Sequence, residues 1–314
     1  MTAAAGRGDS APRGASGMVL GLVPGLGNSF WNVIFNAIED VLIRAGYGVI
    51  FGDTRHDPVR EAHYERLLRA GHADGLILFN PRASSAPRLI DLGLPTVAVY
   101  SDMPDFDRVP TFGVASREAA VAMVEYLIGL GHRRIAHLAG PEDNVDAEER
   151  WRGYADALAA AGIAPDPELL WRGGYSFVAG AKAAQRYFAL SDARPTAIFA
   201  ASDEMAIGCI SALRESNISV PGDVSVAGFD GIEYSAMYEP ALTTMLQPRG
   251  ELGRLAAEDL VRQLSGDRAT PGRTTLLPCK LVVRQSVGPA GRGAKARRRT
   301  GDAGERRDKS AASR

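Results

Sequence analysis

The segment 24–30 (PGLGNSF) is the closest approach to a cofactor motif in this sequence. It follows the apolar run 18–23, and Asp53 lies about 25 residues beyond it, which approximates the spacing of a dinucleotide-binding turn. The third glycine of that motif would allow close packing of a helix on its strand, and here it is replaced by Phe30. We therefore expect no dinucleotide cofactor, and favour a ligand-contacting loop or a plain tight turn.

Other catalytic and metal-binding patterns are missing from the sequence. It contains no P-loop, no HExxH, no CxxC pair and no GxSxG turn. The five histidines are scattered, and no pair of acidic residues has a spacing that forces a catalytic arrangement. We expect neither an enzyme nor a bound metal or cofactor.

The elements that would position any site follow from an alternation of short apolar runs and longer amphipathic segments. We expect strands at 18–23, 47–51, 75–79, 96–99, 134–139, 196–200, 224–227 and 276–283. We expect helices at 30–45, 58–70, 87–92, 119–130, 148–161, 178–189, 204–216 and 249–264. This alternation predicts an α/β fold with two doubly wound parallel-sheet lobes and a ligand cleft between them. A closed eight-fold barrel is disfavoured because the two halves of the pattern look like two separate doubly wound sheets.

Length and composition agree with such a protein. The 314 residues are 46% hydrophobic and 23% charged, which is ordinary for a globular chain of about two domains. No run approaches the roughly 18 apolar residues of a membrane-spanning helix. The first 17 residues carry no apolar signal region, and two cysteines fit a reducing compartment. We expect a cytoplasmic protein without membrane contact.

Charge is distributed unevenly along the chain. Residues 289–314 hold nine basic and three acidic side chains, so this segment is +6 and the remainder −7. The composition predicts a disordered basic tail, and a flexible N-terminal segment at 1–17. An acidic body is a poor surface for nucleic acid.

Eight motifs follow one another along residues 18–288: GLVP (21–24), NSFW (28–31), ADGLIL (73–78), LGHRRIA (130–136), RWRGY (150–154), PTAIFAASD (195–203), VPGDVSVAGFD (220–230) and PALTTMLQP (240–248). Together they resemble the effector-binding core of the LacI/GalR family of transcription regulators, which is similar in fold to type I periplasmic sugar-binding proteins. The resemblance implies a homodimeric sensor of a sugar, nucleoside or related metabolite. It also implies an N-terminal lobe of 18–112 plus 248–273 and a C-terminal lobe of 113–247 plus 274–288.

Three residues combine this resemblance with suitable chemistry. Arg150 occupies a position where the family carries an arginine facing the ligand, and its planar fork of donors suits paired hydroxyls or a carboxylate. Asp230 ends an apolar strand and would accept hydrogen bonds from hydroxyls, and Tyr175 matches an aromatic that stacks on the ligand. We expect loss of Arg150 or Asp230 to weaken binding at least tenfold without changing the unfolding of the free protein.

Further candidate contacts are Phe30, Trp31, Arg55, Ser202 and Gln247. Phe30 and Trp31 could instead pack within the core, and Arg55 could remain exposed. We favour Ser202 as a contact and Asp203 as the cap of the following helix. Tyr100 stands where many relatives carry an aspartate, which argues against a simple hexose.

One departure from the family concerns its DNA-binding head. Family regulators begin with a helix-turn-helix domain, whereas only 17 residues precede the first strand here. We expect this chain to bind operator DNA only if such a head is restored upstream. Family members that form tetramers add a C-terminal leucine heptad helix. Residues 289–314 lack the apolar seam of such a helix, which favours a dimer over a tetramer. The preferred function is the sensing core of a transcriptional regulator, and the alternative is a stand-alone or exported sugar-binding protein for uptake.

Overall fold

A computed structural model of the chain describes residues 16–82, 84–101, 108–191, 194–267 and 272–291. These residues divide into two compact units. Unit 1 contains the described residues of 1–116, 143–146 and 247–279, and unit 2 contains those of 117–142, 147–246 and 280–314. The expectations for the segment 1–15 and for the tail beyond residue 291 lie outside the described residues.

Unit 1 is built on a six-stranded parallel sheet with the order β11-β5-β4-β3-β1-β2. Its strands are β1 (Met18–Val23), β2 (Gly48–Asp53), β3 (Gly75–Phe79), β4 (Thr96–Val99), β5 (Thr111–Val114) and β11 (Thr274–Leu277). Its helices are the 3-10 turn Ser29–Trp31, α1 (Asn32–Arg44), α2 (Pro58–Arg69), α3 (Ala86–Ile90) and α9 (Arg249–Leu264).

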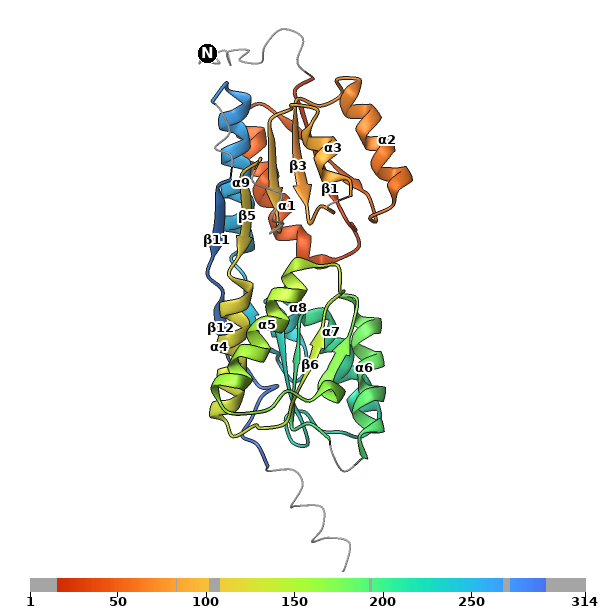
Figure 1. The fold of residues 1–314 in the computed structure, drawn as a ribbon, viewed down its shortest axis with the longest axis vertical. Helices are drawn as coiled ribbons and strands as arrows, with labels where there is room; N and C mark the ends of the chain where they lie inside the picture. The colour runs from red at the N-terminus through yellow and green to blue at the C-terminus, as the bar shows by residue number, and fades with distance from the viewer. Residues whose placement is uncertain (1–15, 83, 102–107, 192–193, 268–271, 292–314) are drawn as a thin grey trace, which may run out of the picture. The chain divides into compact units, whose positions relative to one another are not determined.

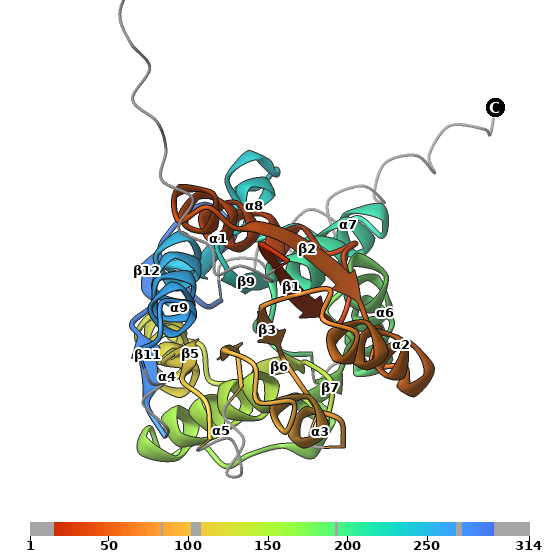
Figure 2. The ribbon, with the colours of Figure 1, turned by 90° about the horizontal axis from the view of Figure 1, so that it is seen from above.

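Alternation along the strands of unit 1 sends side chains to two apolar layers. Val19 and Val23 of β1 join the buried cluster formed with α1 and α9. Leu20 and Leu22 join the cluster formed with α2 and α3. Figures 1 and 2 show α9 and α2 on opposite sides of β1 and β3. The sheet is therefore covered on both faces, as near-continuous apolar strands require.

Unit 2 repeats this plan with the order β12-β10-β9-β8-β6-β7, in which only β12 runs antiparallel to its neighbour. Its strands are β6 (Ile135–Ala139), β7 (Leu170–Arg172), β8 (Ala197–Ala200), β9 (Ser225–Asp230), β10 (Thr243–Leu246) and β12 (Lys280–Val282). Its helices are α4 (Ser116–Gly129), α5 (Val145–Ala160), the 3-10 turn Pro167–Leu169, α6 (Phe177–Ala189), α7 (Asp203–Glu215) and α8 (Glu233–Met237). Figures 1 and 2 show α4 and α6 on opposite sides of β6.

The predicted fold class is confirmed, and the helix expected at 249–264 has those bounds. The single final strand expected at 276–283 is wrong. Pro278 lacks the N–H that a ladder needs, and the chain forms two strands on either side of it. Since β11 pairs with β5, residues 274–277 belong to unit 1 rather than to the C-terminal lobe, and so do residues 113–116.

Helices α6 and α7 approach each other through glycines. A Cβ atom on Gly208 of α7 would lie 2.0 Å from the Phe177 carbonyl oxygen, and one on Gly180 of α6 would lie 2.0 Å from that of Met205. Both distances are far below van der Waals contact with rigid backbone. The two helices can therefore pack this closely only with glycine at these positions.

We expect Gly208→Ala to lower the free energy of unfolding by about 2 kcal/mol or more, because the added methyl forces α6 and α7 apart. Gly129→Ala is the matched control, since Gly129 is an exposed position of α4 with nothing within 4 Å of its Cβ. The control should leave stability unchanged or raise it by up to about 1 kcal/mol. Urea denaturation measures both, and a Gly208→Ala variant as stable as the parent protein would contradict this packing.

His137 of β6 is a fully buried polar side chain in the layer opposite α6 and α7. Its ring stacks on Tyr154 and Phe199 with centroids 5.0 Å away in each case. Nδ1 lies 3.0 Å from the Phe199 carbonyl oxygen and donates to it, and Nε2 has no partner among the described residues. Burial is the main cause that lowers the pKa of His137 to about 3, so the ring is neutral.

The free energy of unfolding should fall as the pH falls from about 6.5 toward 3. In this window the unfolded chain binds a proton at His137 and the folded chain does not, which costs up to about 1.4 kcal/mol per pH unit. His137→Phe should reduce this slope, whereas His72→Phe at an exposed position should retain it. Denaturation curves at pH 7.5, 6 and 5 test this, and equal slopes for the parent and His137→Phe would refute it.

Candidate functional site

Arg150 and Asp230 form a buried ion pair at the carboxyl edge of the sheet in unit 2. Arg150 lies on α5 with 4% of its surface exposed, and Asp230 is the last residue of β9. One terminal nitrogen of the guanidinium donates to the Ala201 carbonyl oxygen at 2.6 Å and lies 3.5 Å from Asp230 Oδ1. Strong donors and a strong acceptor thus lie side by side where ligands bind doubly wound sheets.

Aromatic rings flank the guanidinium. The Arg150 Cζ atom lies 3.9 Å from the centroid of the Phe229 ring and 5.8 Å from that of Tyr175. These distances are typical of cation–π interactions, and such interactions with two rings restrict the orientation of the Arg150 guanidinium. The structure therefore brings Arg150, Tyr175 and Asp230 together in one unit, as the sequence predicts.

Backbone strain accumulates at the same edge. Tyr175 has a φ of +53° and Asp230 a φ of +117°, both outside the ordinary regions for residues with a side chain. Such conformations cost about 1–3 kcal/mol each and persist where the surroundings enforce them. Strained residues of this kind cluster at ligand sites, and these two lie beside Arg150.

The cap of α7 is Ser202 and not Asp203, contrary to the prediction. Ser202 caps α7, because its hydroxyl accepts a hydrogen bond from the Met205 amide at 3.3 Å. Asp203 is the first residue of α7 and is completely buried, and its carboxylate accepts from the Ile232 amide and the Thr244 hydroxyl. The assignment of the cap to Asp203 was therefore wrong. Burial, and then the nearby Asp230 carboxylate, raise the pKa of Asp203 above its usual range.

The aromatic candidates of unit 1 lie within its core. Phe30 and Trp31 are 9% and 8% exposed, and the Trp31 ring meets Phe79 and Tyr100 edge-on. Tyr100 in turn donates its hydroxyl hydrogen bond to Gln247 Oε1 at 2.8 Å. The packing role is thus established for Phe30 and Trp31, and a ligand contact for either stays a prediction.

Arg55 is far more exposed than the other candidates. Its side chain is 66% exposed and pairs with Asp53, 3.0 Å away. It follows β2 with a φ of +49°. The structure thus shows the exposed position that was the alternative for this residue.

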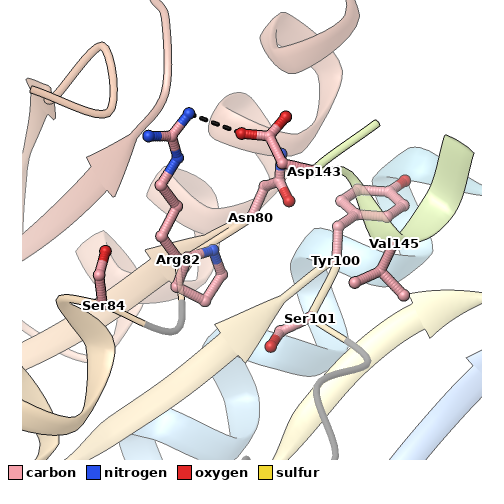
Figure 3. Close-up of a pocket in the computed structure, with 8 residues that line it drawn as sticks. Asn80, Arg82, Ser84, Tyr100, Ser101, Asp143 and Val145 are labelled. Atoms are coloured by element: carbon pink, nitrogen blue, oxygen red, sulfur yellow. Dashed lines mark hydrogen bonds and ion pairs between the residues drawn. The ribbon is translucent and has the colours of Figure 1, made fainter. Parts of the chain in front are cut away.

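A pocket of about 360 Å³ lies in unit 1 at the carboxyl ends of β3 and β4. It is lined by Asn80, Pro81, Arg82, Ser84, Tyr100, Ser101, Asp143 and Val145 (Figure 3). Asn80 and Tyr100 have φ values of +42° and +54°. The Ser101 hydroxyl is buried and has no hydrogen-bond partner within the described ranges. A buried hydroxyl beside a pocket is a group that a polar ligand can satisfy.

Two of the residues that line this pocket form an ion pair. Arg82 and Asp143, 61 residues apart in sequence, meet at 2.7 Å (Figure 3). Both side chains are exposed, by 43% and 63%. Burial and then the positive charge of Arg82 lower the pKa of His56 nearby. Apart from Tyr100, these pocket residues were not among the predicted candidates, although Asn80 directly follows one expected strand and Ser101 lies two positions beyond the next, which is the signal that could have found them.

Two findings concern metal binding and membrane spans among the described residues. No group of three or more His, Cys, Asp or Glu side chains is arranged to hold a metal ion in the parts of the chain that the structure describes. Within the same ranges, no helix combines the length and the apolar character needed to cross a bilayer.

The buried ion pair corrects one further expectation. Arg150→Ala leaves Asp230 buried without its partner, so we expect the free energy of unfolding of the free protein to fall by about 3 kcal/mol at neutral pH. Arg152→Ala is the matched control on the same helix, because Arg152 pairs with Glu148 and Glu149 at the surface. That control should cost less than about 1 kcal/mol. Equal denaturation midpoints for the two variants would contradict the pair.

Comparisons with known proteins agree with this geometry. Residues 124–287 match a family described as a periplasmic binding protein-like domain. The HTH-type transcriptional repressor CytR of Escherichia coli strain K12 is 34% identical over 281 residues, which cover 89% of this chain and 82% of that protein. The solved complex of the transcriptional regulator CelR with cellobiose is similar with a TM-score of 0.80 and 29% identity, over 87% of this chain and 85% of that one. A LacI-family regulatory protein from Chloroflexus aggregans gives a TM-score of 0.76 and 30% identity, over 87% and 99%. The chain belongs to the LacI family of transcriptional regulators, and the match covers their effector-binding core.

Proposed function

We propose that this regulator senses a small hydroxyl-bearing metabolite that binds at Arg150 and Asp230 of unit 2. The observation that carries the proposal is their buried pair, in which a five-donor guanidinium and an acceptor carboxylate meet at 3.5 Å. Adjacent hydroxyls of a sugar or a ribose both donate and accept, so they match this combination. An apolar ligand could not satisfy the hydrogen-bonding capacity that remains on these two buried groups.

Tyr175 supplies the apolar face of the proposed site. Its ring lies beside the guanidinium of Arg150, and the faces of sugar rings and of bases pack on aromatic rings. The relative CelR was solved in complex with cellobiose, which supports a sugar or sugar-like effector for this chain. Ser202 stays a candidate contact, although its hydroxyl is already engaged as a helix cap.

Unit 1 contributes a second set of groups to the proposal. The pocket at the ends of β3 and β4 offers the Asn80 amide and the Ser101 hydroxyl. Gln247 is buried against Tyr100 and can position that phenol. Phe30, Trp31 and Arg55 remain weaker candidates, because the first two are core residues and the third is exposed.

Regulation would follow from a difference in effector affinity between conformations of the protein. A ligand shifts such an equilibrium only by that difference, and the shift would change transcription through operator DNA. We propose a cytoplasmic homodimer as the responding species. The relatives that are repressors favour this function over uptake.

Binding by the parent protein is tested by isothermal titration with cellobiose, D-ribose, cytidine and adenosine as probes. For any probe that binds, Asp230→Asn and Arg150→Lys should each raise the Kd at least tenfold, because a charge-assisted hydrogen bond is lost or misplaced. Arg152→Lys, at the exposed face of α5, should leave the Kd unchanged. Unaltered affinity in both site variants would move the site elsewhere in the protein.

A further inference from the structure

Asp203 makes hydrogen bonds that its own helix does not need. Ser202 already caps α7, yet the Asp203 carboxylate accepts from the Ile232 amide at 2.8 Å and from the Thr244 hydroxyl at 2.5 Å. The Gly231 amide donates to it as well. All three donors belong to the turn after β9 or to the neighbouring strand β10.

That turn carries the effector-facing aspartate in an unfavourable conformation. Asp230 has a φ of +117° and is followed by Gly231 with a φ of +68°. A residue with a side chain adopts such a backbone only where its surroundings enforce it. The Asp203 carboxylate supplies this enforcement, because it binds the amides of the next two residues along the chain.

The Asp203 carboxylate packs against a glycine of β9. A Cβ atom on Gly228 of β9 would lie 2.3 Å from Asp203 Oδ1. A glycine at that strand position therefore allows the carboxylate to reach the turn. A carboxylate accepts from three donors through its two oxygens, whereas an asparagine of the same size replaces one of these oxygens with an N–H donor.

The arrangement also has an electrostatic cost. The Asp203 carboxyl is fully buried, and the negative charge of Asp230 opposes its ionisation. Two buried acids whose charges oppose each other are an unfavourable way to stabilise a core. The presence of both acids is explained if Asp203 holds Asp230 in place.

We propose that Asp203 is a positioning residue of the effector site: its carboxylate clamps the turn 230–232 so that the Asp230 carboxylate faces Arg150. The proposal rests on the function proposed above, because it assigns the clamp to the residue that would bind effector hydroxyls. It concerns the free protein and is tested without any effector.

The test measures amide hydrogen exchange by NMR in the full-length protein, together with the Nε–H resonance of the Arg150 side chain. In Asp203→Asn, the Ile232 amide should exchange at least about tenfold faster, because the acceptor loses its charge and an N–H group replaces one of its two oxygens. The Arg150 resonance should shift, because the partner carboxylate moves. A purely structural role for Asp203 would leave that resonance where it is.

Thr244→Val is the second variant, in case Asp203→Asn fails to fold. It removes one donor to the Asp203 carboxylate, and the Ile232 amide should then exchange about threefold faster or more. Thr243→Val is its matched control on the same strand. Thr243 is equally buried, but its hydroxyl accepts from the Arg284 amide, so the Ile232 amide should keep its rate within about twofold.

Three results would overturn the clamp. One is an unchanged Ile232 exchange rate in Asp203→Asn, or in Thr244→Val if the first variant does not fold. Another is an acceleration that is uniform across the strands of unit 2, and the third is an unmoved Arg150 resonance. None of these results bears on whether cellobiose or a nucleoside binds, so a failure of the clamp is distinct from a failure of the proposed function.

Discussion

The Arg150–Asp230 ion pair takes two charges out of water, and this constraint governs the arrangement of unit 2. Removing each ion from solvent costs several kcal/mol, on the order of what the pair itself returns. A net stabilisation therefore depends on further contacts to the guanidinium, which here are made by the Ala201 carbonyl oxygen and the ring of Phe229. Helix α5 and the ends of β8 and β9 therefore have to meet at one place.

The parallel topology makes such a meeting possible in each unit. In both sheets the first strand along the chain lies between the next two. In unit 1, β1 lies between β2 and β3, and in unit 2, β6 lies between β7 and β8. This order creates a switch point at the carboxyl edge, where successive loops diverge and leave a crevice. Asn80 and Tyr100 lie at that edge in unit 1, and Tyr175 and Asp230 lie at it in unit 2. All four residues have a positive φ. Strained strand ends thus mark the candidate sites in both halves.

Sequence patterns predict those features that depend on local chemistry. The α/β fold, the bounds of α9 and the grouping of Arg150 with Asp230 follow from periodicity, strand ends and family motifs. The identity of the α7 cap does not, because serine and aspartate both cap helices and only the tertiary partners Ile232 and Thr244 draw Asp203 away from that role. The pocket around Ser101 was missed for the same reason, since it is formed by segments as distant as Arg82 and Asp143.

The two ion pairs of the candidate sites differ in how they can respond to a ligand. Arg82 and Asp143 are largely exposed, so their pairing contributes little free energy and either side chain can exchange its partner for a ligand or for water. Arg150 and Asp230 are nearly inaccessible and are held by neighbours that leave them one arrangement. A ligand at the first pair would find adaptable contacts, while one at the second must fit geometry that is already set. Discrimination among effectors should therefore originate in unit 2, where a mismatched ligand would leave buried charges without their hydrogen bonds.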